Sequence, residues 1–161
     1  MQITYLKVPL NKMTFTHRRI REWVEGNARG RTLNLFAGKT LLSCDETRVD
    51  SNPDMKPHYC MDALDFVSDW DGHLFDTVIL DPPYSFRKSM EMYDGHKMSP
   101  FNAVKNRMLR ILAPGARVIT FGYQSVSMGR VRGFKQVHLV VMYHGGAIHD
   151  TLGIVEQMEG K

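Results

Sequence analysis

The sequence predicts an α/β fold with a largely parallel sheet, because apolar runs alternate along the chain with stretches of helical character. The clearest apolar run is Phe75 to Leu80, which is typical of a strand that is buried on both faces of a sheet. The length of 161 residues predicts a single domain over 1–161, and an apolar share of 43% is enough for one buried core.

Local signals predict the individual elements. In chain order we expect a helix over 16–28, strands over 32–36, 47–50 and 58–61, a helix over 63–70, a strand over 75–80, a helix over 100–112, and strands over 117–121, 136–143 and 151–156. Thr16 can cap the first helix, and Asp45 and Glu46 are expected in a turn. The last two strands flank Gly145-Gly146 and predict a terminal antiparallel hairpin.

The charge balance favours a polyanionic partner. The formal net charge is +4 and the isoelectric point is about 9.1, which suits nucleic acid. The basic residues gather in three places: Arg18, Arg19 and Arg21; Arg87 and Lys88; Arg130 and Arg132. No apolar run approaches the roughly 20 residues of a membrane span, and the first residues do not resemble a signal peptide. We therefore expect no membrane partner and a cytoplasmic location.

Cysteine and histidine spacing predicts neither a disulfide nor a metal site. Cys44 and Cys60 form no CxxC pair, so we expect two plain thiols in a reducing compartment. His138, His144 and His149 match no standard ligand spacing, even together with His58 and Cys60. We expect the histidines of the terminal hairpin to lie at the surface.

The strongest chemical signal is the tetrapeptide Asp81-Pro82-Pro83-Tyr84, which directly follows the strand predicted over 75–80. Because proline cannot continue a central strand, the strand delivers a carboxylate, two rigid residues and an aromatic ring to its carboxyl end. Open α/β sheets bind their ligands at that end. The two prolines also remove two backbone donors, which leaves nearby carbonyl oxygens as acceptors.

These groups suit the methylation of an exocyclic amino group. Such a nitrogen is a poor nucleophile, because its lone pair is delocalised into the aromatic ring. The Asp81 carboxylate and the Pro82 carbonyl can accept hydrogen bonds from its two N–H groups. These bonds expose the lone pair and stabilise the positive charge that develops on nitrogen. Tyr84 can stack on the base, an interaction worth roughly 1–3 kcal/mol.

At this point the sequence resembles a known family. The tetrapeptide resembles the DPPY motif of amino-group DNA methyltransferases, which belong to the class I S-adenosylmethionine-dependent methyltransferases. Four further segments resemble cofactor motifs of that family: Thr14-Phe15-Thr16 its FT(P) motif, Leu33-Asn34-Leu35-Phe36-Ala37-Gly38 its DLFAG(S/T)G loop, Val49-Asp50 the acidic end of its second strand, and Asp62-Ala63 the residues beside the cofactor adenine. Together these segments cover most of residues 14–122.

The resemblance implies a class I methyltransferase fold. That fold is a three-layer, Rossmann-like sandwich around a seven-stranded, mostly parallel sheet whose last strand is antiparallel. It also implies S-adenosylmethionine as the cofactor, with an acid at the position of Asp50 on the ribose hydroxyls. The implied cofactor contacts are Thr14, Phe15, Thr16, Asn34, Phe36, Ala37, Gly38, Asp50, Asp62 and Ala63.

The sequence departs from the family pattern around the cofactor loop. Asn34 stands where aspartate is usual, and Thr40 stands where the second glycine is usual. Only eleven residues separate Gly38 from Asp50, and the stretch from Asp50 to Asp62 is equally short. We therefore expect the helices after the first two core strands to be trimmed or lost.

The resemblance implies methyl transfer to an exocyclic amino group of a nucleobase. Adenine N6 in DNA is the first choice, because aspartate at the first position of the tetrapeptide favours adenine in that family. Three alternatives stay open: an RNA enzyme acting on adenine N6 or guanine N2, an enzyme acting on a small molecule or a protein glutamine, and a catalytically silent subunit of a methyltransferase complex.

We expect no separate target-recognition domain within the 161 residues. Recognition is therefore expected from the loop over 85–99, from a homodimer mate, from an accessory subunit, or from low specificity. In that loop Arg87, Lys88 and Lys97 are the candidate nucleic-acid contacts.

Overall fold

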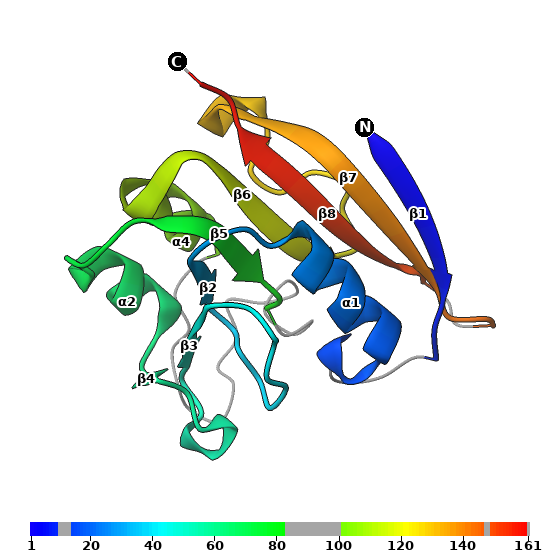
Figure 1. Cartoon of the computed structure of the whole chain (residues 1–161), viewed down its shortest axis with the longest axis horizontal. Coiled ribbons are helices and arrows are strands. Elements are labelled where there is room, and N and C mark those ends of the chain that lie inside the picture. Colours follow the sequence, from blue (N-terminus) through cyan, green and yellow to red (C-terminus); the bar gives the residue numbers. More distant parts are fainter. Residues whose placement is uncertain (10–13, 83–100, 147–148, 161) are drawn as a thin grey trace.

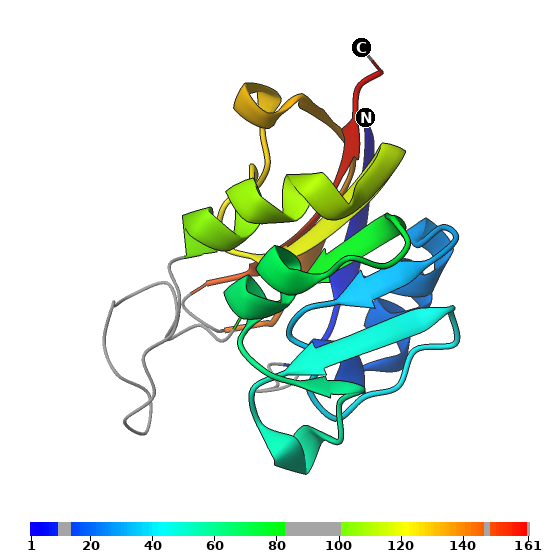
Figure 2. The same ribbon diagram turned by 90° about the vertical axis from the view of Figure 1, so that its left-hand side faces the viewer.

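The computed structural model describes residues 1–9, 14–82, 101–146 and 149–160, and in this part of the chain eight strands form one sheet. Helices cover both faces of the sheet (Figures 1 and 2). The strands are β1 (Gln2–Lys7), β2 (Thr32–Asn34), β3 (Glu46–Asp50), β4 (Tyr59–Cys60), β5 (Phe75–Leu80), β6 (Leu112–Gly122), β7 (Phe134–Tyr143) and β8 (Thr151–Met158). The helices are α1 (Arg18–Asn27), α2 (Ala63–Asp69) and α4 (Phe101–Arg107), with short 3-10 turns η1 (Thr14–Thr16), η2 (Pro53–Met55), η3 (Met108–Ile111) and η4 (Arg130–Arg132).

The strand order across the sheet is β1-β7-β8-β6-β5-β2-β3-β4. Of these strands β8 runs antiparallel to both of its neighbours, and every other pair is parallel. From β2 the chain continues to β3 and β4 on one side, whereas β5 and β6 extend the sheet on the other. The order therefore reverses between β2 and β5, which is where open α/β sheets bind ligands.

Two apolar cores lie on opposite faces of the sheet. One contains Phe66 of α2 and Val104 of α4, packed on Leu33 and Val78 of the central strands. The other places α1 over the side of the sheet formed by β6, β7 and β8, and includes Trp23. The cores confirm the expected three-layer sandwich, which Figure 2 shows from the side. No helix in the described residues is long and apolar enough to cross a membrane.

Most of the predicted elements are confirmed within two or three residues, and β5 has the predicted bounds. The strand β1 is missing from the prediction, so the sheet has an eighth strand beside β7. The prediction also misplaced the cap of α1, because His17 rather than Thr16 accepts a bond from the Arg19 amide. Glu46 is the first residue of β3 and not a turn residue.

The expected loss of two helices is confirmed. Residues 35–45 connect β2 to β3 with turns and bends, and the connection from β3 to β4 contains the short turn η2. The first connection still covers the sheet, because Leu42 is buried in the core below α1 and Cys44 packs against that core. Ser43 also donates its backbone N–H to Glu25 of α1, over 2.7 Å.

Candidate active site

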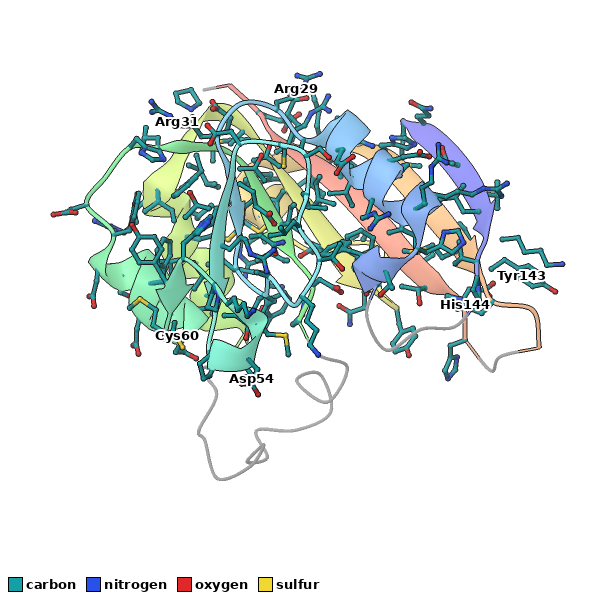
Figure 3. All side chains as sticks on the ribbon, turned by 60° about the horizontal axis from the view of Figure 1, so that its bottom comes forward. Arg29, Arg31, Asp54, Cys60, Tyr143 and His144 are labelled. Carbon is teal, nitrogen blue, oxygen red and sulfur yellow. The ribbon has the colours of Figure 1, made fainter. Side chains whose placement is uncertain are left out.

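The candidate site lies at the carboxyl edge of the sheet, between β2 and β5. Asn34 pairs with Ile79 across these strands, and Leu35 donates its N–H to the Ile79 carbonyl. Asp81, directly after β5, is therefore brought beside the start of the loop that follows β2. Its side chain is partly exposed, whereas Pro82 is buried. Figure 3 shows Arg29 and Arg31 at the opposite, amino edge, away from Asp54 and Cys60 at the carboxyl edge.

Gly38 and Asp50 form the most defined part of this edge. The Gly38 backbone N–H donates to Asp50 Oδ2 over 3.0 Å, and Asp50 Oδ1 accepts from the Asn52 amide over 2.9 Å. Gly38 has a φ of +58°, which favours glycine, and a Cβ atom built on it would meet no described residue within 4 Å. No described side chain thus covers the Gly38 backbone, and the adjacent Asp50 carboxylate can accept from the hydroxyl groups of a ligand.

The neighbours of Gly38 line the same edge in different ways. Ala37 is buried and donates its N–H to the Val49 carbonyl, which fixes the loop to β3. Phe36 is partly buried, and its ring centre lies 6.3 Å from that of Phe101 at the start of α4. Phe36 therefore offers an apolar wall next to Asp81.

Asp62 and Ala63 start the helix α2 beside the end of β3. Asp62 Oδ1 accepts from the Leu64 amide over 2.8 Å, so this carboxylate caps the helix. Met61 donates its N–H to the Asp50 carbonyl, which holds the two segments together. Ala63 is buried. The structure brings Asp62 to the predicted edge and assigns its Oδ1 atom to the helix cap.

The segment Thr14–Thr16 also reaches this edge. Phe15 is buried, and its ring meets the Phe121 ring edge-on at 5.3 Å. Thr120 pairs with Leu80, so Phe121 lies beside Asp81 in the sheet. The 3-10 turn η1 thus packs close to the end of β5.

Asn34 is placed differently from the other predicted cofactor contacts. Its side chain is fully buried beneath the loop, and Nδ2 donates to Glu46 Oε1 over 2.9 Å. Its Oδ1 atom is buried and has no hydrogen-bond partner among the described residues. In this arrangement Asn34 supports the loop from below, and its contact with a cofactor stays a prediction.

Sequence reasoning missed a buried ion pair beneath the same loop. Glu46 and Arg48 lie on one face of β3, with Glu46 Oε2 3.6 Å from Arg48 Nη1 and both side chains almost fully buried. Arg48 donates to the carbonyls of Gly38, Thr40 and Met55, and Glu46 accepts from the Leu42 amide. A signal in the sequence could have revealed this pair. Glu46 and Arg48 are two residues apart in a short strand, so their side chains lie on the same face of the sheet.

Burial also corrects the expectation for His138, whereas His144 is half-buried and His149 is exposed as expected. His138 is buried against α1, and its Nδ1 atom lies 3.0 Å from Asn27 Oδ1. Nε2 accepts from Trp23 Nε1 over 3.3 Å and lies 2.8 Å from Thr4 Oγ1. Burial lowers the pKa of His138, and the Arg117 guanidinium lowers it further. Among the described residues no group of three His, Cys, Asp or Glu side chains could hold a metal.

Five of the predicted site residues lie outside the described residues: Pro83, Tyr84, Arg87, Lys88 and Lys97. Their roles stay predictions. The described part of the site therefore consists of Asp81 and Pro82 with the surroundings of Gly38 and Asp50.

The comparisons with known proteins define the class of fold. No protein-family model and no curated protein sequence matches the chain. Solved structures do match, and among them are methyltransferases whose fold superposes on most of the chain. The chain thus has the class I methyltransferase fold that its sequence predicts.

NodS, an N-methyltransferase from Bradyrhizobium japonicum WM9, superposes with a TM-score of 0.63 at 14% identity, over 88% of this chain and 95% of NodS. The same protein in complex with S-adenosyl-L-homocysteine gives a TM-score of 0.58 at 15% identity, over 89% of each chain. TrmN from Thermus thermophilus gives 0.61 at 15% identity, over 88% of this chain and 48% of TrmN. At these identities the likeness concerns the fold.

Proposed function

We propose that this chain is an S-adenosylmethionine-dependent methyltransferase that acts on an exocyclic amino group of a nucleobase, with adenine N6 in DNA as the first candidate. The observation that carries the proposal is the position of Asp81. It follows the central strand β5 at the point where the strand order reverses, at the same carboxyl edge of the sheet as Gly38 and Asp50.

The proposed cofactor site fits the residues around Gly38. No described residue fills the space at this positive-φ glycine, and the adjacent Asp50 carboxylate is a suitable acceptor for ribose hydroxyls. Phe36, Ala63 and the segment Thr14–Thr16 supply apolar and hydroxyl groups at the same edge. When bound, S-adenosylmethionine supplies an electrophilic methyl group. NodS has been crystallised with S-adenosyl-L-homocysteine, and this supports the same cofactor class here.

Asp81 and Pro82 act on the amino group. The Asp81 carboxylate accepts a hydrogen bond from one amino N–H and the Pro82 carbonyl accepts one from the other, which directs the nitrogen lone pair toward the methyl group. Both acceptors gain strength as positive charge develops on nitrogen, and this differential stabilisation lowers the barrier. After transfer, the nitrogen loses one proton to Asp81 or to water. That NodS is an N-methyltransferase supports a nitrogen target.

An aromatic pair beside the site supports a nucleobase as the substrate. Tyr123 follows β6, and its ring centre lies 5.4 Å from that of His149, which precedes β8. Both residues are exposed. The carboxyl end of β6 lies next to that of β5, so this pair offers flat surfaces on which a base can stack.

The proposed nucleic-acid partner also needs positive charge at this edge. Arg19 is exposed and Arg21 is partly exposed on the first turns of α1, directly after η1. Arg18 is exposed too, but it is paired with Glu22 over 2.6 Å. We therefore assign Arg19 and Arg21 to the phosphate backbone, beside Arg87, Lys88 and Lys97, with sequence recognition left to a second copy or an accessory subunit.

The test is methyl transfer from labelled S-adenosylmethionine to duplex DNA, single-stranded DNA and RNA, followed by analysis of the nucleosides. The wild-type protein should transfer the labelled methyl group to N6 of adenine in DNA. Asp81→Ala should lose on the order of 100-fold or more in rate with little change in cofactor affinity. Asp71→Ala is the matched control, because Asp71 is an exposed aspartate that precedes the same strand at its amino end.

The outcomes separate the alternatives. Label in RNA alone would move the substrate to RNA, on adenine N6 or guanine N2 as the nucleoside analysis decides. Cofactor binding without transfer to any nucleic acid would favour a catalytically silent subunit or another substrate class. Equal turnover of Asp81→Ala and wild type would disprove the role of Asp81.

A further inference from the structure

The loop after β2 lacks the support that the fold usually gives such a segment. Residues 35–45 make the crossover from β2 to β3 without a helix, so their peptide groups do not bond to one another in a regular ladder. Gly38, which faces the proposed cofactor, lies in the middle of this crossover. Some other interaction must hold its backbone in place.

The Arg48 guanidinium supplies that interaction from below. Its Nη2 donates to the Gly38 carbonyl over 2.5 Å, and its Nη1 donates to the Thr40 carbonyl over 2.7 Å. A longer bond of 3.3 Å joins Nη2 to the carbonyl of Met55 in η2. One side chain therefore joins both shortened crossovers of the sheet, where helices would otherwise lie.

Glu46 completes the support from the same strand. Its Oε2 accepts from the Leu42 amide over 3.2 Å, and its Oε1 accepts from Asn34 Nδ2 over 2.9 Å. The pair thus fixes a carbonyl on one side of the loop and an amide on the other. Both side chains are at most 4% exposed, so each charge needs a partner, and the Glu46 carboxylate compensates the charge of Arg48.

Gly38 is consequently held through both of its backbone polar groups, the N–H and the carbonyl. Asp50 accepts from its N–H, and Arg48 donates to its carbonyl. The planar fork of a guanidinium can reach several carbonyls at once, whereas a lysine ammonium on a flexible stem cannot reproduce that geometry. A backbone held in place before the ligand arrives binds more tightly, because less conformational freedom is lost on binding.

We infer that Arg48, compensated by Glu46, is a positioning residue that holds Gly38 and Thr40 in the cofactor-binding conformation in place of the missing helix. The inference rests on the proposed function, because it assigns the cofactor to this loop. It predicts that Arg48 governs the affinity for S-adenosylmethionine and leaves the chemical step at Asp81 unchanged.

The experiment compares variants that separate positioning from charge compensation. Arg48→Met alone leaves Glu46 buried without a counter-charge, so it tests folding more than binding. The double variant Glu46→Gln with Arg48→Met removes both charges together, and Asn34 can rotate its amide to accept from the new glutamine. The double variant should therefore fold, yet it lacks every bond from Arg48 to the loop.

The matched control is Arg110→Met. Arg110 also donates from Nη1 to two backbone carbonyls, those of Val67 and Trp70 at the end of α2, away from the loop. Each variant is titrated with S-adenosylmethionine and with S-adenosyl-L-homocysteine by calorimetry. Its Tm and the hydrogen exchange of the amides in 38–42 are measured alongside.

We expect the double variant to bind both ligands roughly tenfold or more weakly than wild type, with faster exchange in the loop and a Tm above that of Arg48→Met. Its KM for the cofactor should rise by a similar factor while kcat at saturation is retained. Arg48→Lys should recover part of the affinity, and Arg110→Met should bind as wild type does.

Wild-type affinity in the folded double variant would overturn the inference, because charge compensation would then be the whole role of Arg48. That result leaves the proposed function intact. If wild type itself binds neither ligand, the proposed function is wrong and the inference fails with it. A loss of affinity in Arg110→Met equal to that of the double variant would also contradict a specific role for Arg48.

Discussion

Two buried polar networks lie on the same face of the sheet and differ in charge and reach. The network of Asn34, Glu46 and Arg48 is ionic, and its bonds run outward to the backbone of the loop over 35–45. The network around His138 joins Thr4, Trp23 and Asn27 in side-chain contacts that stay between β1, β7 and α1. The first network holds a ligand-facing segment, and the second holds two layers of the fold together.

The ionic network lies where the fold has lost a helix, and the neutral network lies beneath an intact one. A buried charge requires full compensation, so an apolar pair of similar volume is often as stable as a buried ion pair. Stability alone therefore does not explain Glu46 and Arg48. We explain the ion pair by the loop over 35–45, which has to keep one conformation without a helix. The neutral network lies under the helix α1, whose backbone already has regular hydrogen bonds.

The largest expected effect comes from breaking the ionic network. Glu46→Ala leaves the Arg48 charge buried and removes acceptors from Asn34 and Leu42, so the free energy of unfolding should fall by about 3–5 kcal/mol. Asn27→Ala in the neutral network should cost about 1–3 kcal/mol. Urea unfolding of both variants measures the two losses. A larger loss of unfolding free energy in Asn27→Ala than in Glu46→Ala would contradict the expectation that the ionic network contributes more to stability.

A second prediction concerns the open side of the loop. Gly38→Leu should abolish cofactor binding, because a side chain would fill the space that the ligand needs and would strain the positive φ of +58°. Asp50→Ala should weaken binding by roughly tenfold by removing an acceptor for the ribose hydroxyls. Calorimetry checks both variants, and unchanged affinity in the two would mean that the cofactor binds elsewhere.

How far the sequence alone determined these results differs between the two regions. The bounds of β5 and the place of Asp81 followed from an apolar run and two prolines, which are local signals. The role of Arg48 depends on carbonyls of Gly38 and Met55 that come from two separate crossovers, and no local pattern encodes such a meeting. His138 looked like a surface residue because its partners Thr4 and Asn27 are more than 100 residues away.

The neutral network should make stability depend on pH. The pKa of His138 is lower in the folded protein than its ordinary value near 6.5, so the unfolded chain binds the proton more readily. As the pH is lowered below about 6.5, His138 is protonated in the unfolded chain before it is protonated in the folded protein. The free energy of unfolding therefore decreases as the pH decreases, until the pH is below the pKa of His138 in the folded protein. His138→Gln should reduce this slope, by at most about 1.4 kcal/mol per pH unit. Identical pH profiles of unfolding in the two proteins would contradict the assignment.

The smallest expected effect distinguishes the two thiols. Cys44 and Cys60 are both free, and Cys60 is exposed. Burial raises the pKa of the Cys44 thiol, and the Glu46 and Glu25 carboxylates raise it further, so less thiolate forms there. Alkylation at neutral pH should label Cys60 first, and mass spectrometry of the peptides reads the order. Faster labelling of Cys44 would show that the loop over 35–45 opens readily.

The strand β1 has a consequence for the order in which the molecule is completed. It pairs in parallel with β7, and its Thr4 meets His138 across a separation of 134 residues. During synthesis β1 therefore has no partner strand until β7 has left the ribosome. Closing so long a segment is slow relative to local pairing. The central strands β2 and β5 can pair earlier, so the ligand-binding edge can take shape before the far side of the sheet is closed.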